Sequence, residues 1–493
     1  MELLFASGLL SLASYWFYGK FRKRNDCFSA AGLKRIPPVW GCLPLFGHVL
    51  QFALFGELNF LRRCHKKDGG IFKIKLFRKN IVVACDHHLV PAFFKEREEY
   101  LSHSAAIAPF GIVFPGGEFG YDVPTALGYM RKALAFNKEE VIARVEEETQ
   151  GLVDRLQHRW TENNSNNNLD LKDELYRHIT RISYSSFCPT KLSETLITEL
   201  HGFFDQVSQV LRWTYLLPNW LVPWICKLGL SRSRSSLVKI FEEHVRTYQS
   251  GAGTVESILI DHAIEYGDKV GGSPSNVTKY AAGFIIGFIY STVGNTTAAL
   301  VNTIQYLAMP ENCRILADLR EECQRSVSVQ TDFRQLLTAP LLNACIMETA
   351  RSSANFIGTP RVPKAGLQNL GGYFVEESVD LIALCGPILQ VFGNTESYFK
   401  NPTKFWPYRF VEGPMTGPAA EPTSSHYIIN WAGGLHACPG KNFALYAIKI
   451  CVAHFILNFD FEIEGSVPEE FKYVAPIAFG QRDVKVVLKK KEE

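Results

Sequence analysis

Several hallmarks of common protein classes are missing from this 493-residue sequence. Basic and acidic residues number 52 and 49, for a net charge of only +3, so the composition gives no reason to expect a nucleic-acid partner. The twelve cysteines contain no Cys-x-x-Cys pair, which argues against a zinc site, and they follow no spacing typical of a disulfide framework. No internal repeat is visible. With 47% apolar residues, the chain is instead long enough to bury one large core.

A further absence lies inside the longest apolar stretch. No acidic residue occurs between Lys279 and Glu311. The segment is apolar at helical spacing, so we expect a long helix over residues 280–308. Gly283 and Gly287 would let the backbone of this helix pass close to a flat ligand. Any such ligand would face a helix that lacks a strong proton donor.

The most informative stretch that is present is residues 431–440, Trp-Ala-Gly-Gly-Leu-His-Ala-Cys-Pro-Gly. Glycine permits positive φ and close backbone approach, so this composition suits a loop wrapped tightly around a ligand. An apolar helical segment follows from about Lys441. Cys438 would therefore precede a helix N-terminus, where partial positive charge favours a thiolate. A thiolate there can serve as an axial ligand of haem iron, although a lone cysteine is more often a buried packing residue.

Two charged motifs accompany this loop. Glu348 and Arg351 form a Glu-x-x-Arg pair on one face of an expected helix. Arg409 lies in residues 405–410, Phe-Trp-Pro-Tyr-Arg-Phe, on a loop shaped by proline. Each motif is weak alone, but the order and spacing of all three resemble the cytochrome P450 family. The resemblance implies a mainly α fold with small β-sheets, the P450 fold, with haem b (iron protoporphyrin IX) as cofactor.

The resemblance also implies roles for individual residues. Cys438 corresponds to the ligand of the haem iron, the metal in this site. Glu348, Arg351 and Arg409 correspond to a buried charge network that braces the haem loop. The complete set of cofactor-binding residues implied in this way is Cys438, His436, Trp431, Tyr121, Lys132, Arg409, Glu348 and Arg351.

The loop departs from the usual family pattern at two positions. Trp431 stands where the family has phenylalanine, and it would cover the sulfur side of the haem. His436 stands where the family has an arginine that pairs with a haem propionate. Histidine can act as such a donor, but more weakly and with pH dependence. The histidine is similar to a variant found in fungal members.

A second region is similar to the sterol 14α-demethylase branch of the family. Residues 114–117 read Phe-Pro-Gly-Gly, and residues 121–124 read Tyr-Asp-Val-Pro. The resemblance implies that Tyr121 hydrogen-bonds a haem propionate. It implies the same role for a lysine in the next helix, where Lys132 is the best match and Arg131 the alternative. A solvated surface position is the other interpretation of these two cations.

The long apolar helix supplies the expected catalytic residues, Asn295 and Thr296. Residues 293–297, Val-Gly-Asn-Thr-Thr, resemble the branch that contains bile-acid hydroxylases and prostacyclin synthase. Most family members place an acid and a threonine here to deliver protons. Asn295 and Thr296 can hydrogen-bond an ordered water but cannot donate a proton strongly. Which of them lies over the iron stays open, as does the alternative that both bond only within the helix.

The N-terminus predicts membrane attachment. Residues 2–18 are apolar apart from one glutamate and three serines, and basic residues follow within 20–24. Positive charge after the apolar run argues against a signal peptide and for a single anchor that leaves the body in the cytosol, at the endoplasmic reticulum. A segment lying on the membrane is the alternative. The expected organisation is an anchor at 1–24, a proline-rich hinge at 25–48 and a haem-thiolate monooxygenase domain at 49–493.

The resemblance implies a monooxygenase that uses O2 and electrons from NADPH-cytochrome P450 reductase, with or without cytochrome b5, because no flavin or nicotinamide domain is recognised in the chain. An aromatic run at 213–224 suggests an entrance for an apolar small-molecule substrate at the membrane, or else core packing. Fungal specialised metabolism is the leading context, with an amino-acid-derived, terpenoid or polyketide substrate. The alternatives are a sterol or steroid hydroxylase or demethylase, a reductase-independent isomerase or dehydratase acting on a peroxide, and a non-catalytic haem- or lipid-binding protein.

Overall fold

The structure is a computed structural model of the whole chain. It describes residues 29, 32–106, 123–134, 138–162, 170–188, 192–214, 221–251, 257–271, 273–328, 333–354, 358–393, 398–411, 428–465, 472–473, 480–481 and 485–490.

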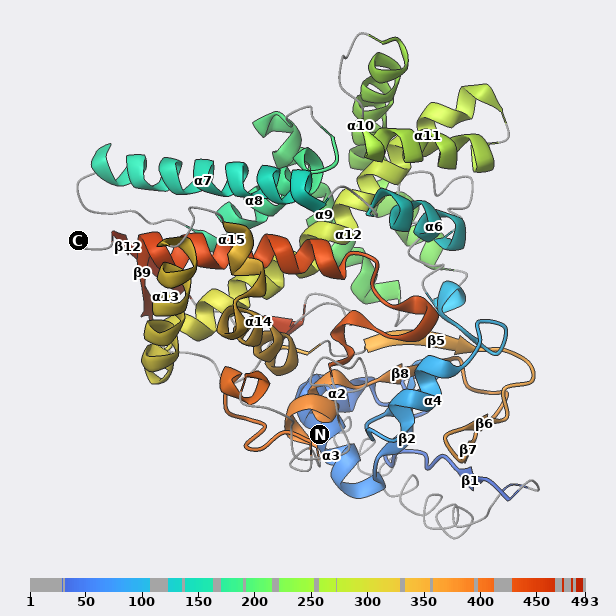
Figure 1. The fold of residues 1–493 in the computed structure, drawn as a ribbon. Coiled ribbons are helices and arrows are strands. Elements are labelled where there is room, and N and C mark those ends of the chain that lie inside the picture. The colour runs from blue at the N-terminus through green and yellow to red at the C-terminus, as the bar shows by residue number, and fades with distance from the viewer. Residues whose placement is uncertain are drawn as a thin grey trace, which may run out of the picture.

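Helices form most of the described chain (Figure 1). The α-helices are α2 Val49–Phe55, α3 Glu57–Asp68, α4 Leu89–Lys95, α6 Val123–Ala133, α7 Lys138–Glu162, α8 Leu171–Ser185, α9 Glu194–Thr214, α10 Val222–Gln249, α11 Ile258–Gly271, α12 Pro274–Ala308, α13 Cys313–Ser328, α14 Pro340–Ser352 and α15 Lys441–Asn458. Short helical turns are η1 Pro310–Asn312, η2 Phe333–Thr338, η3 Ile388–Phe392, η4 Pro407–Phe410, η5 Ile429–Trp431 and η6 Gly434–His436.

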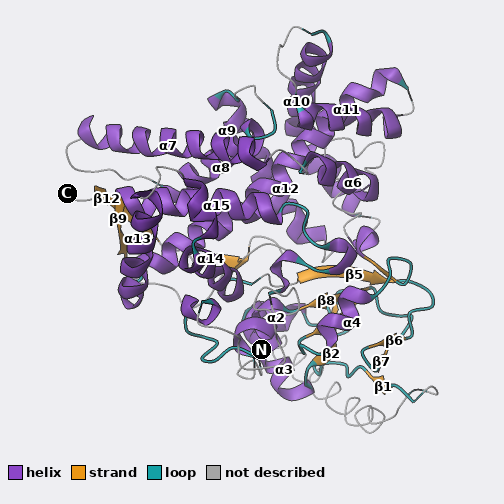
Figure 2. Cartoon of the chain, in the orientation of Figure 1, coloured by secondary structure: helices purple, strands orange, loops and turns teal. Residues whose placement is uncertain are grey.

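The strands are short and belong to small sheets; the two larger sheets lie beside α2, α3 and α4 in the lower part of Figure 2, and the β9–β12 pair lies beside α13. They are β1 Lys34–Arg35, β2 Ile71–Leu76, β3 Lys79–Ala84, β4 Leu101–Ser102, β5 Gly358–Pro363, β6 Asn369–Leu370, β7 Tyr373–Phe374, β8 Leu381–Leu384, β9 Phe459–Glu464, β10 Lys472–Tyr473, β11 Gly480–Gln481 and β12 Lys485–Lys490. The largest sheet has the order β2-β3-β8-β5-β4. This architecture confirms the expected mainly α fold with small β-sheets.

Strands β2 and β3 form a hairpin, paired antiparallel from Ile71 opposite Ala84 to Leu76 opposite Lys79. That register leaves only two residues for the turn, and Phe77 adopts a φ of 50°.

Helix α12 forms the centre of the helical part. It packs against α8, α10, α11, α14 and α15 (Figure 1). Among the described residues it is the one helix that is apolar and long enough to cross a membrane, over 276–308, but 78% of its most apolar window is buried inside the protein. Its hydropathy therefore reflects its place in the core. The anchor expected at 1–24 lies outside the described residues.

Part of the expected hinge is packed on the sheet rather than extended away from it. The N–H of Val39 donates to the Lys73 carbonyl at 2.9 Å, and the N–H of Lys73 donates to the Pro37 carbonyl at 2.8 Å. His48 is 2% exposed, with Nδ1 3.1 Å from the Lys75 carbonyl oxygen and Nε2 3.2 Å from that of Val39. The backbone is therefore hydrogen-bonded to the sheet from residue 37 onward.

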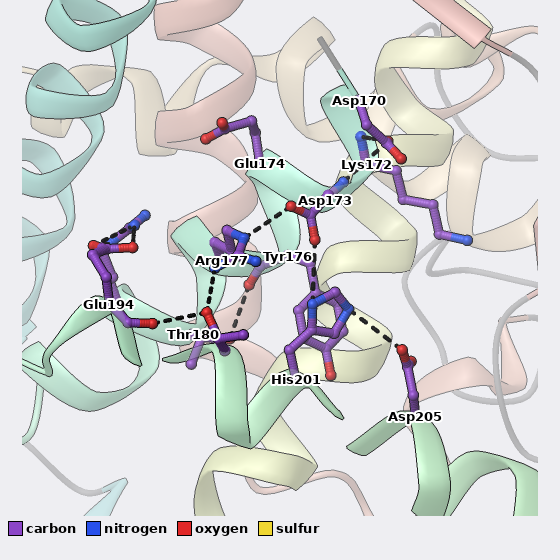
Figure 3. A network of polar contacts seen from close by, with 12 residues as sticks. Asp170, Lys172, Asp173, Glu174, Tyr176, Arg177, Thr180, Glu194, His201 and Asp205 are labelled. Atoms are coloured by element: carbon purple, nitrogen blue, oxygen red, sulfur yellow. Dashed lines mark hydrogen bonds and ion pairs between the residues drawn. The ribbon is translucent and has the colours of Figure 1, made fainter. Parts of the chain in front are cut away.

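A polar network joins α8 to α9 (Figure 3). Asp173 accepts from Arg177 Nε at 2.8 Å, and its other oxygen lies 3.2 Å from His201 Nδ1. The other ring nitrogen of His201 lies 3.7 Å from Asp205, and the ring stacks on Tyr176 with 4.2 Å between centroids. Because α8 packs directly on α12, this network sets the position of α9 relative to the core helix.

Candidate haem-binding site

The glycine-rich loop is shaped by turns and leads directly into α15, as the sequence predicts. The N–H of Cys438 donates to the carbonyl of Trp431 at 2.8 Å, which closes the loop. Gly434 has a φ of +63°, and a Cβ added there would lie 2.3 Å from the backbone oxygen of Phe94. Glycine is therefore needed at Gly434 both for its backbone conformation and for the close approach of α4.

Cys438 lies two residues before the N-cap of α15 and is accessible, but protein surrounds its sulfur on several sides. Burial raises the pKa of the thiol, whereas hydrogen bonds from the N–H groups of Gly440 and Lys441 lower it. The N–H groups at the start of the helix thus lower the pKa of the Cys438 thiol, as expected, but burial raises it by more. A cation facing the sulfur would supply the remaining stabilisation that a thiolate needs.

The three residues of the expected charge network are in contact. Arg351 donates to both carboxylate oxygens of Glu348, from Nε and Nη2, at 2.8 Å each. Nε of Arg409 lies 3.2 Å from Oε2 of Glu348. The backbone N–H of Trp406 donates to Oε1 at 2.8 Å. The Glu348 and Arg351 side chains have zero exposure and that of Arg409 is 4% exposed, so the network lies fully inside the protein.

This network ties the long segment before the loop to α14. Arg351 Nη1 donates to the Gln390 carbonyl at 2.6 Å, and Arg409 Nη1 donates to the Lys400 carbonyl at 2.6 Å. Breaking a buried ion pair from one side leaves an uncompensated charge and costs about 3–5 kcal/mol. The backbone at Gln390 and Lys400 is therefore fixed by these buried arginines.

Arg361 on β5 was not singled out from the sequence. Its side chain has zero exposure, and within the described part of the chain none of its three guanidinium nitrogens has a hydrogen-bond partner. Its guanidinium carbon lies 5.0 Å from the centroid of the Phe93 ring, and burial lowers its pKa to about 10. Burying a cation without acceptors is costly, so the guanidinium is placed to meet an anion.

Of the two cations expected on α6, Arg131 is the one that reaches the loop. Its Nη2 donates to the carbonyl of Leu435 at 2.6 Å. The ammonium of Lys132 lies 3.5 Å from Glu265 and 4.4 Å from the centroid of the Tyr129 ring, with the side chain 56% exposed. Arg131, the alternative assignment, is therefore the better placed of the two.

His436 faces a carboxylate in this structure. Its Nε2 lies 2.8 Å from Oε2 of Glu98, and its ring centroid lies 5.0 Å from that of His103. Burial lowers the pKa of His436, and the charge of Arg361 lowers it further, while Glu98 raises it. His436 thus lies next to Arg361 and Arg131 among charged groups at one end of the loop.

The middle of α12 has an open face. Ser291, Gly294 and Asn295 are exposed although the residues around them in the helix are mostly buried, and a Cβ added at Gly294 would meet nothing within 4 Å. Thr296 is 5% exposed. Spacing of three and four residues puts the three open positions on one side of the helix. The structure therefore places Asn295, rather than Thr296, on the open face.

Comparison with known proteins decides the family. A family model described as cytochrome P450 matches residues 37–489. The chain belongs to the cytochrome P450 family. It is 27% identical over 487 residues to a probable lanosterol 14-alpha demethylase of Acanthamoeba polyphaga mimivirus, covering 97% of this chain but only 65% of the viral protein.

Two further relatives of this P450 extend the comparison. The chain is 22% identical over 355 residues to a fusicocca-1,10(14)-diene-8beta,16-diol C-9 hydroxylase of Phomopsis amygdali, which covers 66% of this chain and 65% of that protein. The solved structure of cyanobacterial CYP120A1 with bound retinoic acid superposes with a TM-score of 0.69 at 17% identity, covering 93% of this chain and all of that one. That likeness confirms the P450 fold. As a family member, the protein is an oxidoreductase of the monooxygenase type.

The residues of this P450 fit a haem group, which the family binds through its iron. Cys438 would supply a sulfur donor to the iron, and Arg361, which has no hydrogen-bond partner among the described residues, would meet the carboxylates together with Arg131 and His436. A Cβ added at Gly294 on α12 would meet nothing within 4 Å. Tyr121, expected to join this set, lies outside the described residues.

Trp431 is nearly buried, at 8% exposure, and packs in a small apolar cluster with Ala298, Met347, Ala350 and Ala444. Its indole Nε1 has no hydrogen-bond partner within the described residues. The side chain thus bridges the loop to helices α12, α14 and α15. Its expected role of covering the sulfur side of the haem stays a prediction.

The missed residue, Arg361, did carry a signal in the sequence. It is a charged residue in Gly358–Pro363, a segment that forms a strand in the structure, and it comes ten positions after Arg351. A charged residue in a short strand can point outward as easily as inward, because successive side chains alternate between faces. Only the register of β5 against β8 and β4 settles that Arg361 is enclosed.

Proposed function

We propose that the protein is a haem-thiolate monooxygenase, anchored in the endoplasmic reticulum membrane by a single N-terminal span, that oxidises an apolar small molecule with O2. The observation that carries this proposal is the combination of an accessible Cys438, a fully buried charge network and a buried Arg361 that has no hydrogen-bond partner among the described residues. Electrons come from NADPH-cytochrome P450 reductase, with cytochrome b5 as a second donor.

Haem bound at this loop supplies the iron centre at which oxygen is activated, and a thiolate ligand favours O–O cleavage. The chain positions that group. Cys438 ligates the iron, and Arg361, Arg131 and His436 hold the carboxylates. The Glu348 network braces the segment that precedes the loop, because its members reach backbone carbonyls at residues 390 and 400.

Asn295 provides the polar group on the open face of α12. An amide can orient a water molecule but does not release a proton near neutral pH. The proton needed in the reaction therefore arrives through water rather than from a carboxylic acid on this helix. Thr296, which is buried, supports the helix rather than contacting the reacting atoms.

The substrate is an apolar molecule of the sterol or terpenoid class. The reaction belongs to specialised metabolism. Support comes from the relatives, one named for lanosterol and another for a diene diol. Departure of the loop and of α12 from the usual family pattern favours specialised metabolism over sterol synthesis.

The absorption spectrum of the dithionite-reduced protein with carbon monoxide tests the proposal first. A Soret band at the long wavelength typical of thiolate ligation, lost in Cys438→Ala, supports it. A band typical of histidine ligation, or no haem uptake, contradicts it. Substrate screening then uses the full chain with reductase and NADPH, and follows product by mass spectrometry.

One observation favours a second candidate function. The open face of α12 carries Asn295 and no acid, which suits an isomerase or dehydratase that takes a peroxide substrate and needs no proton delivery. Conversion of a lipid hydroperoxide without NADPH or reductase would support this alternative. Strict dependence of every product on reductase would exclude it.

A further inference from the structure

Glu98 lies just after α4, outside every motif discussed above, and its carboxylate is held by an array of donors. The Ser102 hydroxyl donates to Oε1 at 2.7 Å, and the backbone N–H of Ser104 donates to the same oxygen at 2.9 Å. The backbone N–H of His103 donates to Oε2 at 2.9 Å. These bonds lower the pKa of Glu98 to about 2 although burial raises it, so the carboxylate is ionised and fixed in direction.

The oxygen that accepts from His103 also faces the haem loop. Oε2 of Glu98 lies 2.8 Å from Nε2 of His436, whose side chain is 14% exposed. The two atoms are in ion-pairing range but make no aligned hydrogen bond, so the contact is the close approach of an ionised carboxylate to a ring nitrogen. A carboxylate held this close to the ring restricts the orientation of the imidazole.

The surroundings explain why such a contact is needed. His103, Arg361 and Arg131 all lie close to His436: the His103 ring centroid is 5.0 Å away, and both arginines are near enough for their charges to act on the ring. An arginine at this loop position could reach a partner with its long side chain and several donors, whereas histidine is short and has two ring nitrogens. A histidine at this loop position therefore depends on a neighbour to hold its ring among cations.

We propose that Glu98 is a positioning residue for His436: it holds the imidazole in the haem loop, so that retention of the cofactor depends on the Glu98–His436 pair and not on His436 alone. The proposal rests on the proposed haem site. The Glu98–His436 contact joins the segment after α4 to the loop after η5, and these two segments are distant in sequence. Glu98 acts through the ring and makes no contact with the iron ligand.

A double-mutant cycle tests the proposal on the holoprotein. Glu98→Gln, His436→Ala and the double variant are compared by the rate at which haem transfers to excess apomyoglobin. We expect each single change to speed haem loss by about tenfold. In the His436→Ala background, Glu98→Gln should add less than about twofold, because the residue through which it acts is gone. The propionate-bending band in resonance Raman spectra should shift in the same direction in both single variants.

Two controls keep the outcomes distinct. Glu99→Gln removes a neighbouring carboxylate that pairs with Arg97 at 2.5 Å, and it should leave haem transfer unchanged. Circular dichroism of each apoprotein reports whether the turn at residues 98–104 persists. Effects that multiply in the double variant, or an unshifted propionate band in Glu98→Gln, would overturn the positioning role. Loss of the thiolate spectrum in the unmodified protein would instead refute the proposed function itself.

Discussion

Nε2 of His178 on α8 lies 3.6 Å from the sulfur of Cys451 on α15, and both atoms lie 3.2–3.6 Å from the hydroxyl of Thr149 on α7. All three residues are fully buried. The helix that follows the haem loop is therefore joined to two others through a histidine that has no access to solvent.

This contact predicts acid sensitivity. Burial lowers the pKa of His178 from 6.5 to about 3, so the imidazole is neutral in the folded state. The unfolded chain binds its proton as the pH falls through 6.5, whereas the folded protein does so only near pH 3. Stability is therefore complete above pH 6.5 and decreases between pH 6.5 and 3, by about 2 kcal/mol at pH 5 from this group.

Urea unfolding of the protein at pH 7.5 and pH 5 measures this loss. His178→Gln should flatten the pH dependence, although it lowers stability at neutral pH through lost packing. His88→Asn, at an exposed position on the surface, is the matched control and should keep the slope of the parent. A slope that His178→Gln leaves unchanged would assign the acid sensitivity to other groups.

The charge network predicts a large effect from a conservative change. Arg351→Lys cannot reproduce the two parallel bonds to Glu348, and it leaves the Gln390 carbonyl without its donor. We expect a loss of about 3–5 kcal/mol in the free energy of unfolding, with loss of haem on purification. Chemical unfolding and the haem-to-protein absorbance ratio measure both effects. Arg325→Lys on the surface of α13 should change neither, and a stable, haem-replete Arg351→Lys would contradict the bracing role.

Arg361 predicts opposite effects on the two forms of the protein. Without an anion the buried guanidinium has no hydrogen-bond partner among the described residues, so Arg361→Met should stabilise the apoprotein by about 1–3 kcal/mol. With haem bound, the same change removes a partner of the carboxylates and should lower the melting temperature and speed haem loss. Thermal melts of both forms measure this. Equal shifts in the same direction would mean that Arg361 does not face the cofactor.

Substitutions at the neighbouring residues Asn295 and Thr296 of α12 should have different effects. Asn295→Ala removes the polar side chain on that face and should raise the fraction of NADPH oxidised without product. Thr296→Ala, at a buried position, should lower stability by about 1–2 kcal/mol with little change in that fraction. The ratio of product to NADPH consumed, once a substrate is found, separates the two. An unchanged ratio in Asn295→Ala would remove its proposed role.

Local pattern predicted the loop and its helix well. Two glycines, a cysteine and Pro-Gly before an apolar run specify a tight turn into α15, and the structure starts that helix at Lys441. The Glu348–Arg351 pair was equally predictable, since residues three apart on a helix share a face. Family membership followed from the joint spacing of these motifs, and the P450 family model confirms it.

What sequence could not predict depends on contacts between distant segments. Glu98 and His436 are separated by more than three hundred positions, and no local pattern marks either as a partner of the other. Arg131 and Lys132 are adjacent in the sequence, so they point in different directions from α6. Which of the two reaches the loop depends on how α6 is rotated about its axis, and the sequence does not give that rotation. The burial of Arg361 could be recognised only from the strand register, because the alternation of side chains along a strand does not say which face is enclosed.

The bonds around Glu348 also constrain how the protein is made. Glu348 and Arg351 leave the ribosome together, but Arg409 and the N–H of Trp406 emerge some sixty residues later, and Cys438 later still. Until then the buried carboxylate has only one of its partners, so α14 cannot settle into its final place. Synthesis at roughly 5–20 residues per second makes this delay several seconds. A cofactor ligated by Cys438 can therefore be captured only after Trp406, Arg409 and Cys438 have all been synthesised.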